Sequence, residues 1–299
     1  MKKAIVFGGS GFLGSHVADE LTSAGYSVTV FDLREAAYLQ DNQKFIKGDI
    51  LDKKNVEKAV KDNDIVYNFA GIADLDEAAE NPTRTISTNI IGNVNILESC
   101  RKNNIERYVF ASTMYVYSNA GSFYRCSKQA CELIIEEYSK KYHLPFTILR
   151  YGSLYGPRSN DRNSMHNFLK QALENKKIIR LGDGDELRDY IHVYDAAKLS
   201  VKILDEEFKN QHVILTGTQQ VRIKDLLLMI SEILNNEIEL EFREHNADNH
   251  HYDITPFRFS PRLAKKIVDY THIDLGQGIL DLLNILYSEK QQNKDDKNN

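Results

Sequence analysis

The sequence predicts an α/β protein built on a doubly wound parallel sheet, with a smaller mixed α/β lobe on the C-terminal side. A glycine-rich turn, residues 8–14, follows directly on a short apolar run and opens a helical pattern. Apolar runs then alternate with helical periodicity as far as about residue 158, which is typical of parallel strands joined by crossover helices. Together these patterns indicate a Rossmann-type fold. We expect its strands near residues 3–7, 27–32, 43–47, 65–69, 107–112 and 145–151.

The glycine turn predicts a site for an anionic dinucleotide. One glycine permits the tight turn, one lets the backbone approach a pyrophosphate, and one lets the helix pack closely on the strand. The start of the helix from residue 15 to residue 24 adds free N–H groups and the positive end of its dipole. The residues expected to contact the pyrophosphate are Gly8, Gly11, Phe12, Leu13 and Gly14.

The second predicted strand ends in a carboxylate. Asp32 lies at the distance from the glycine turn where an acid accepts hydrogen bonds from the adenosine ribose, and Leu33 is placed in the same cofactor site. The negative charge of Asp32 repels a 2′-phosphate, although Arg34 partly offsets it. The sequence therefore favours NAD over NADP.

Composition and charge limit the classes of protein to which the chain can belong. The 299 residues are 42% hydrophobic and carry a net charge of −5, so we expect no general affinity for nucleic acid or anionic membranes. No apolar run approaches the ~20 residues of a membrane span. The first strand begins at once, which leaves no room for a signal peptide, and the three cysteines show no paired spacing. We expect a cytoplasmic protein.

The pattern divides the chain into two lobes and a tail. Residues 1–158 are expected to form the NAD-binding Rossmann domain, and 190–216 to return to it with a helix and a strand. Residues 159–189 and 217–287 are expected to form the substrate-binding lobe, with helices near 222–234 and 276–287. Residues 288–299 are entirely polar and charged, so we expect a mobile tail.

A tyrosine and a lysine four residues apart form the second informative constellation. On a helix, Tyr124 and Lys128 face the same side and can act on one site. A phenol with a pKa of ~10 is a poor base at neutral pH, but a neighbouring ammonium stabilises the phenolate. The phenolate then takes the proton of a substrate alcohol while the hydride leaves the same carbon for NAD.

The strand over residues 107–112 delivers hydroxyl groups, including that of Thr113, to the edge where ligands bind in open α/β sheets. With this strand, the chain resembles the extended short-chain dehydrogenase/reductases, in particular their nucleotide-sugar epimerases and dehydratases. The resemblance runs from residue 3 to about residue 285. Its motifs are the glycine turn, Gly48-Asp49-Ile50, Asn68-Phe69-Ala70-Gly71, the strand ending at Thr113, Tyr124-x-x-Ser127-Lys128, residues 149–158 and residues 182–193.

The resemblance implies roles for individual positions. Thr113 matches the residue that hydrogen-bonds the substrate oxygen, Tyr124 the general base or acid, and Lys128 the residue that binds the nicotinamide ribose. Arg188 matches an arginine that holds the diphosphate of a sugar nucleotide, a role that suits a planar guanidinium. The further positions implied to bind the cofactor are Asp49, Ile50, Phe69, Ala70, Gly71, Asn89, Tyr151 and Ser153.

Departures from the family pattern limit the reaction. Met114 and Tyr115 follow Thr113 where 4,6-dehydratases carry an Asp-Glu pair, and the glutamate of the family's decarboxylases is also missing from this stretch. Hydride chemistry at the sugar 4-position does not need those acids. The residues expected to contact the substrate are Thr113, Met114, Tyr124, Ser153 and Arg188.

Other departures leave the sugar and the base open. Only ten residues separate Thr113 from Tyr124, where the family usually has a longer loop that helps to form the sugar pocket. Ser153 replaces a common asparagine, and residues 249–253 stand where an arginine usually helps to hold the nucleotide. A bulkier sugar such as a heptose, or a guanine nucleotide, is therefore permitted.

Three functions follow from these patterns. The first is a 4-epimerase for a nucleotide-diphosphate sugar, similar to UDP-glucose 4-epimerase and serving surface-polysaccharide biosynthesis, that keeps NAD tightly bound. The second is a net 4-dehydrogenase or 4-keto reductase, for example on a GDP-heptose, and the third is a non-catalytic dinucleotide sensor.

The partners expected from the sequence are a nucleotide-diphosphate sugar and a second copy of the chain. In the related family, helices that match residues 92–102 and 126–141 pair across a two-fold axis, which implies a homodimer. The histidines at 245, 250 and 251 have no metal-ligand spacing, so we expect a solvated loop there and no metal.

Overall fold

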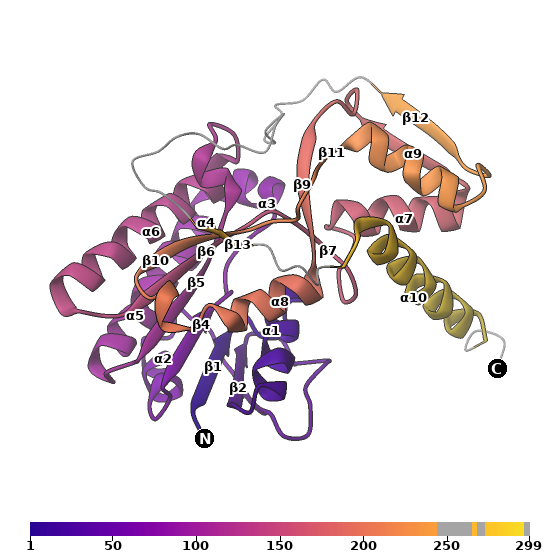
Figure 1. Ribbon diagram of the computed structural model, residues 1–299. Coiled ribbons are helices and arrows are strands. Elements are labelled where there is room, and N and C mark those ends of the chain that lie inside the picture. The colour runs from indigo at the N-terminus through magenta and orange to yellow at the C-terminus, as the bar shows by residue number, and fades with distance from the viewer. Residues whose placement is uncertain (244–264, 268–272, 296–299) are drawn as a thin grey trace.

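The computed structural model describes residues 1–243, 265–267 and 273–295. A large parallel sheet with helices on both faces forms one part of the molecule, and a smaller lobe stands at the carboxyl ends of its strands (Figure 1). The predicted fold class is confirmed.

The main sheet has eight strands in the order β13-β10-β6-β5-β4-β1-β2-β3, and each neighbouring pair is parallel. The strand order reverses beside β1, where chain connections leave in opposite directions and open a crevice at the carboxyl edge. The strands are β1 (Lys3–Phe7), β2 (Ser27–Asp32), β3 (Lys44–Lys47), β4 (Ile65–Asn68), β5 (Arg107–Thr113), β6 (Phe146–Tyr151), β10 (Gln211–Leu215) and β13 (Lys265–Ile267).

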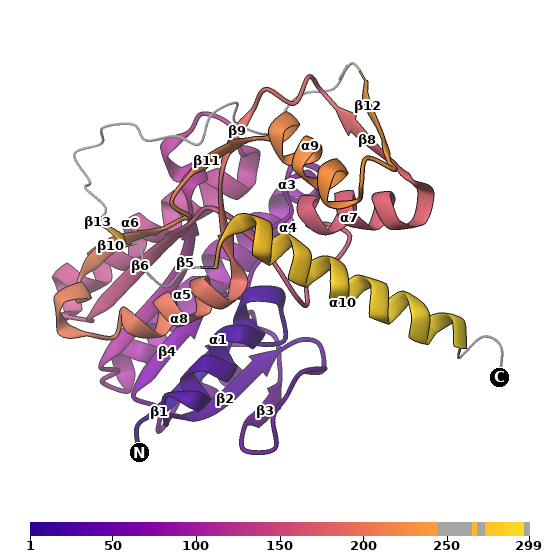
Figure 2. The ribbon, with the colours of Figure 1, turned by 45° about the vertical axis from the view of Figure 1, so that its right-hand side comes forward.

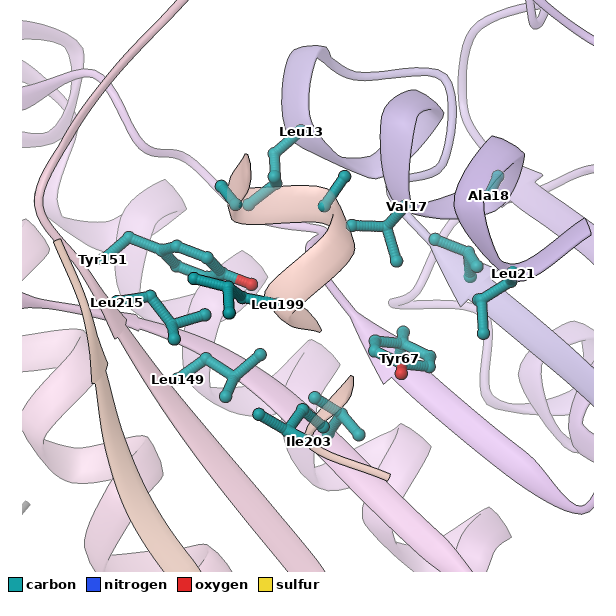
Figure 3. Packing of buried hydrophobic residues seen from close by; sticks show 14 of the residues in the cluster. Leu13, Val17, Ala18, Leu21, Tyr67, Leu149, Tyr151, Leu199, Ile203 and Leu215 are labelled. Atoms are coloured by element: carbon teal, nitrogen blue, oxygen red, sulfur yellow. The ribbon is translucent and has the colours of Figure 1, made fainter. Parts of the chain in front are cut away.

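Helices cover both faces of this sheet because its strands are apolar on both sides. On one face, α1 (Phe12–Ser23) and α8 (Val193–Lys202) pack over a core that includes Tyr67 and Tyr151, which Figure 3 shows among leucine, valine and isoleucine side chains. The other face carries α2 (Lys53–Val60), α5 (Gly92–Lys102) and α6 (Ser122–Tyr142). Short elements join them: α3 (Leu75–Glu80), α4 (Pro82–Ile86), the π-helical turn η1 (Ser87–Ile91), and the 3₁₀ turns η2 (Met114–Tyr117) and η3 (Glu206–Phe208).

The smaller lobe has its own hydrophobic core between two small sheets and three helices. The helix α10 leads away from the body of the molecule, as Figures 1 and 2 show from two sides. The lobe contains β7 (Ser153–Tyr155), β9 (Leu187–His192), β11 (Gln220–Arg222), β8 (Lys177–Leu181), β12 (Glu239–Arg243), α7 (Ser164–Asn175), α9 (Ile223–Ile233) and α10 (Leu275–Asp295).

The predicted domain boundaries need three corrections. The strand β7 lies inside the range 1–158 but pairs with β9 in a sheet of the smaller lobe. The strand β13 lies inside the range 217–287 but extends the main sheet beside β10. Helix α10 continues to Asp295, so residues 288–295 are helical rather than a tail. Glutamate, lysine and glutamine propagate a helix readily once its packed first turns have nucleated it.

None of the helices in the described part of the chain has the length and apolar character that a bilayer crossing requires.

Candidate functional site

The glycine turn has the close packing that its sequence predicts. Gly8 has φ +76°, and a Cβ placed on it would lie 2.6 Å from the backbone nitrogen of Ala70. A Cβ on Gly14 would lie 2.2 Å from the carbonyl oxygen of Gly8. Gly11 caps the N-terminus of α1 without a side chain, so the first amides of Phe12 and Leu13 face the turn. Only glycine fits these contacts, and the turn keeps the open cradle that a diphosphate needs.

The carboxylate of Asp32 ties the second strand to the glycine turn. It accepts hydrogen bonds from the amide of Ser10 at 3.1 Å and from the amide of Arg34 at 3.0 Å. The next side chain, Leu33, is 56% exposed and stands at the surface beside this carboxylate. The predicted ribose-binding acid is thus at the carboxyl edge of β2, next to the turn.

The residues after the third strand divide between surface and core. Asp49 uses its carboxylate to accept a hydrogen bond from the amide of Leu51 at 2.8 Å. Ile50 is only 6% exposed, and its side chain packs against Gly92 of α5. Hydrophobic burial has directed the side chain of Ile50 into the core, so only its backbone is left for the cofactor contact that the resemblance implies.

A buried asparagine connects the fourth strand to helix α6. Asn89, in the π-helical turn η1, donates to the carbonyl of Ile72 at 3.0 Å and to the hydroxyl of Ser127 at 2.9 Å, and accepts from the amide of Ile72 at 2.7 Å. Ser127 in turn donates to the carbonyl of Tyr124 at 2.7 Å. The connection fixes the first turn of α6 relative to the segment that follows β4.

That segment holds the other residues implied to bind the cofactor. The amide of Phe69 donates to the carbonyl of Phe7 on β1 at 2.8 Å, and that of Ala70 donates to the side chain of Asn68 at 3.1 Å. Gly71 leaves room for Asn89, because a Cβ on it would lie 2.7 Å from Asn89 Oδ1. The segment thus crosses the carboxyl edge close to the glycine turn.

The structure brings the three predicted catalytic residues together. Thr113 is the last residue of β5, and Tyr124 and Lys128 occupy successive turns of α6. The Lys128 Nζ lies 5.8 Å from the centre of the Tyr124 ring, 4.7 Å from the centre of the Phe110 ring, and 2.7 Å from the carbonyl oxygen of Ala111, to which it donates. A hydroxyl, a phenol and an ammonium thus converge at one edge of the sheet, which is the set that proton transfer with an alcohol requires.

Burial makes the Lys128 ammonium electrostatically prominent. Its side chain is almost fully enclosed, and desolvation lowers its pKa from 10.5 to about 8, while Cys131 and Glu132 act in the opposite direction. At neutral pH the ammonium keeps its proton. In this weakly polarisable setting its positive charge acts on the nearby phenol more strongly than it would in water.

A buried ion network lies beneath these residues. Glu132, one helical turn after Lys128, pairs with Arg150 of β6 at 2.6 Å and accepts from the hydroxyl of Ser112 at 2.5 Å. Arg150 also donates to the hydroxyl of Tyr117 in η2, and to His212 of β10 at 2.9 Å. One carboxylate therefore joins α6 to the two strands that carry Thr113 and Tyr151. This network was not predicted from the sequence, although the i, i+4 spacing of Lys128 and Glu132 was a signal for a buried charge cluster.

Two predicted site residues point into the core instead. Met114 is completely buried, so the structure contradicts a substrate contact by its side chain. Tyr151 is 5% exposed, and its hydroxyl lies 2.6 Å from Ser200 Oγ within the core of Figure 3. Only the backbone of Tyr151 is left for the cofactor contact that the resemblance implies. Both side chains leave the edge because a residue's direction in a strand or a 3₁₀ turn follows from its register.

Tyr115 was not predicted to contact the substrate, but its side chain, unlike that of Met114, lies beside Tyr124. Its ring contacts the Tyr124 ring edge to face, with centroids 6.2 Å apart, and its amide donates to Thr113 Oγ1 at 3.3 Å. The half-buried ring of Tyr115 is adjacent to the phenol of Tyr124.

The predicted substrate residues of the smaller lobe share one sheet face. Ser153 of β7 is paired with Tyr190 of β9, and Arg188 lies two residues before Tyr190 on the same strand. Because side chains alternate along a strand, Ser153 and Arg188 point to the same side. Arg188 is 7% exposed, and its Nη1 donates to the carbonyl of Leu187 at 3.0 Å.

The histidine-rich segment of the sequence, with His245, His250 and His251, lies outside the described residues. So do residues 249–253, which were considered for the nucleotide. Within the described ranges, no three histidine, cysteine or acidic side chains are grouped as metal ligands would be.

Comparison with known proteins places these motifs in one family. The model of the NAD-dependent epimerase/dehydratase family matches residues 4–217, which include the glycine turn, the three catalytic candidates and Arg188. A putative UDP-glucose 4-epimerase of Methanocaldococcus jannaschii is 31% identical over 255 residues, which cover 78% of this chain and 82% of that protein. A UDP-N-acetyl-alpha-D-glucosaminuronate decarboxylase of Bacillus cytotoxicus is 28% identical over 265 residues, which cover 80% and 82% of the two chains.

A solved structure shares the fold. The UDP-glucose 4-epimerase of Thermus thermophilus in complex with NAD superimposes with a TM-score of 0.82, over 94% of this chain and 98% of that chain, at 24% identity.

Proposed function

The chain belongs to the NAD-dependent epimerase/dehydratase family, and from this premise we propose that it is a 4-epimerase of a nucleotide-diphosphate sugar. The observation that carries the proposal is the convergence of Thr113, Tyr124 and Lys128 at the carboxyl edge of the sheet, beside a glycine turn shaped for a diphosphate. The putative 4-epimerase relative at 31% identity supports the same reaction.

The cofactor-binding residues fit NAD. Gly8 and Gly14 keep a space that a side chain would fill, and the Asp32 carboxylate stands at the end of β2 to accept the ribose hydroxyls. Asn89 orders the wall formed by the segment after β4. When bound there, NAD supplies the acceptor and then the donor of the hydride at the sugar 4-carbon.

The chain's own residues handle the proton. The Tyr124 phenolate, stabilised by the Lys128 ammonium, takes the proton of the 4-hydroxyl as the C4–H bond breaks. Thr113 Oγ1 hydrogen-bonds the same oxygen and holds it against Tyr124. In an epimerase, Tyr124 returns the proton after the 4-keto sugar has presented its other face.

Substrate recognition is assigned to the smaller lobe. Arg188 and Ser153 share a sheet face, and the planar guanidinium of Arg188 suits a diphosphate. We propose a nucleotide-diphosphate sugar as the ligand.

The residues after Thr113 favour chemistry confined to the 4-position. Elimination of water from the sugar needs a proton donor and an acceptor in addition to the tyrosine. Met114 is buried and Tyr115 carries no carboxylate, so the turn that presents Thr113 supplies no carboxylic acid for either role. A net 4-dehydrogenase or 4-keto reductase would use the same three residues, and it is the alternative that the experiment below separates.

We also propose a homodimer. Helices α5 and α6 contact each other and leave apolar side chains at the surface, among them Leu133 at 46% and Ile91 of the adjoining turn at 51% exposure. Exposed apolar residues on adjacent helices favour a symmetric helical contact. Leu133→Glu is expected to halve the mass measured by light scattering, and a wild-type mass of one chain would contradict the proposal.

The function is tested with a panel of UDP-, GDP-, CDP- and dTDP-sugars while the absorbance of bound reduced nicotinamide is followed. An epimerase gives transient reduction and a sugar inverted at the 4-position. Lasting reduction with a 4-keto product would establish the dehydrogenase instead. If no sugar reduces the cofactor, and native mass spectrometry shows NAD bound, the non-catalytic sensor would replace both.

A further inference from the structure

The short connection between Thr113 and helix α6 places a second tyrosine beside the catalytic one. In the 3₁₀ turn η2, successive side chains are rotated by about a third of a turn, so Met114 enters the core while Tyr115 stays at the surface of the site. The amide of Tyr115 donates to Thr113 Oγ1 at 3.3 Å. The position of Tyr115 is therefore fixed relative to the hydroxyl that is assigned to the substrate oxygen.

The ring of Tyr115 packs directly on the ring of Tyr124. The two centroids are 6.2 Å apart and the planes meet at 77°, which is the edge-to-face geometry that aromatic pairs prefer. We therefore expect a substrate alcohol at the Tyr124 hydroxyl to lie close to the aromatic ring of Tyr115.

The connection is shaped around that ring. Gly121, the residue before α6, has φ +99°, and a Cβ placed on it would lie 2.7 Å from Tyr115 Cδ1. The loop is held by Arg125, whose Nη1 donates to the carbonyl of Ser118 at 2.9 Å, and by the amide of Ala120, which donates to Ser118 Oγ at 2.9 Å. The Tyr115 ring is therefore braced between this loop and Tyr124.

From this geometry we infer that Tyr115 is a specificity-determining residue, the aromatic wall against which the sugar of the nucleotide sugar packs. The inference rests on the proposed function, since it takes Thr113 and Tyr124 to act on a sugar. Binding pockets for small molecules use aromatic side chains as apolar surface and a few polar groups for orientation. Here Thr113 and Tyr124 orient the reacting hydroxyl, and the Tyr115 ring supplies the surface for the C–H bonds beside it.

We expect Tyr115 to contribute to binding of the sugar and not to binding of the nucleotide. Tyr115 contacts the catalytic end of the site, whereas Arg188 lies on β9 in the other lobe. Loss of the ring therefore weakens binding of a nucleotide sugar and leaves binding of the bare nucleoside diphosphate unchanged. The contacts with Tyr124 and Gly121 are made by the ring, so Tyr115→Phe keeps both of them.

The test compares UDP-glucose with UDP by calorimetry on the NAD-loaded protein. If the panel above selects another base, the nucleotide sugar and diphosphate of that base are used. We expect Tyr115→Ala to raise the Kd of the nucleotide sugar about tenfold and that of the diphosphate less than about twofold. Tyr115→Phe should keep both within about twofold of wild type. The matched control is Tyr287→Ala, an exposed tyrosine on α10, which should change neither.

A second variant moves the ring without replacing it. Gly121→Ala places a methyl group 2.7 Å from Tyr115 Cδ1 and 3.0 Å from Arg125 Cβ, at a φ of +99° that strains alanine. It should displace the Tyr115 ring and reproduce the selective loss for the nucleotide sugar with Tyr115 intact, while binding of the diphosphate shows whether the rest of the site is preserved. Circular dichroism and NAD content confirm that each variant is folded.

Equal losses for sugar and diphosphate in Tyr115→Ala, or no loss in either, would overturn the inference. Failure of the proposed function is distinguishable, because it appears in the wild type as no cofactor reduction by any sugar of the panel. That result would remove the inference as well.

Discussion

Two regions of the molecule hold carboxylates paired with cations, and they differ in their exposure to water. Beneath the residues that we propose to be catalytic, Glu132 and Arg150 are 3% and 2% exposed and join α6 to β6. At the margin of the smaller lobe, Lys177 of β8 pairs with Glu239 and Glu241 of β12, with side chains between 30% and 66% exposed. Both sets link neighbouring elements of the fold.

This difference in exposure determines which of the two regions tolerates substitution of a charged residue. A buried pair cannot lose one member without leaving the other charge desolvated, whereas an exposed pair exchanges its partner for water and salt. The floor of the catalytic site is therefore constrained in charge and shape. The outer lobe, which we assign to substrate recognition, is free to vary at its surface.

The largest expected effect tests the buried pair. Glu132→Gln leaves the Arg150 guanidinium without a counter-charge and weakens the hydrogen bond from Ser112. We expect the free energy of unfolding to fall by about 3–5 kcal/mol, measured by urea denaturation.

The matched control is Glu241→Gln at the exposed pair, which should leave the urea midpoint unchanged within error. Equal losses of unfolding free energy in the two variants would contradict the difference between the buried and the exposed pair.

The next prediction concerns the buried ammonium of Lys128. Burial lowers its pKa from 10.5 to about 8, so between these values the folded protein binds fewer protons than the unfolded chain. The penalty for the charged lysine is fully present below pH 8 and disappears as the pH rises towards 10.5. Relative to Lys128→Met, wild-type stability should gain about 3 kcal/mol from pH 7 to pH 10.5.

This gain is measured as the difference between the two denaturation curves at each pH, which cancels the titration of other groups. A difference that is flat with pH would show that the ammonium is not held in a desolvated setting.

An effect of similar size, on the reaction barrier rather than on the stability of the fold, is expected for Tyr124→Phe. Removing the hydroxyl removes proton transfer but keeps the ring that packs on Tyr115. Turnover should fall about 100-fold or more, close to 3 kcal/mol in barrier, with NAD content and melting temperature unchanged. Steady-state kinetics on the sugar that the panel identifies provides the measurement, and wild-type turnover would eliminate Tyr124 as the base.

The smallest expected effect is that of a substitution in the smaller lobe. Arg188→Lys keeps the charge but loses the planar fork, so KM for the nucleotide sugar should rise about tenfold with little change in kcat. A fall in kcat at constant KM would instead place Arg188 in the chemical step. It would contradict the assignment of catalysis to the main sheet and of substrate recognition to the smaller lobe.

The main sheet and the helix that carries Tyr124 and Lys128 could be predicted because each depends on local patterns. The glycine turn fixes the start of α1, and the spacing of Tyr124 and Lys128 sets both on one helix face. Residues whose direction depends on packing were assigned less well. Met114 and Tyr151 turned into the core, and the ring of Tyr115, for which no substrate contact was predicted, packs on the Tyr124 ring.

Long-range pairing was equally hidden from the sequence. Lys265–Ile267 is a short segment with weak strand character, yet it extends the main sheet because β10 leaves an edge with free backbone groups. Glu132 and Arg150 are 18 residues apart, and only the packing of α6 against β6 makes them partners.

The sequence by itself determined which chemical groups are present and the order of strands and helices, since both follow from side-chain type and periodicity. The tertiary structure decided which of those groups share a desolvated space. Burial and charge pairing arise between segments distant in the chain, and their energies depend on enclosure that no single segment creates.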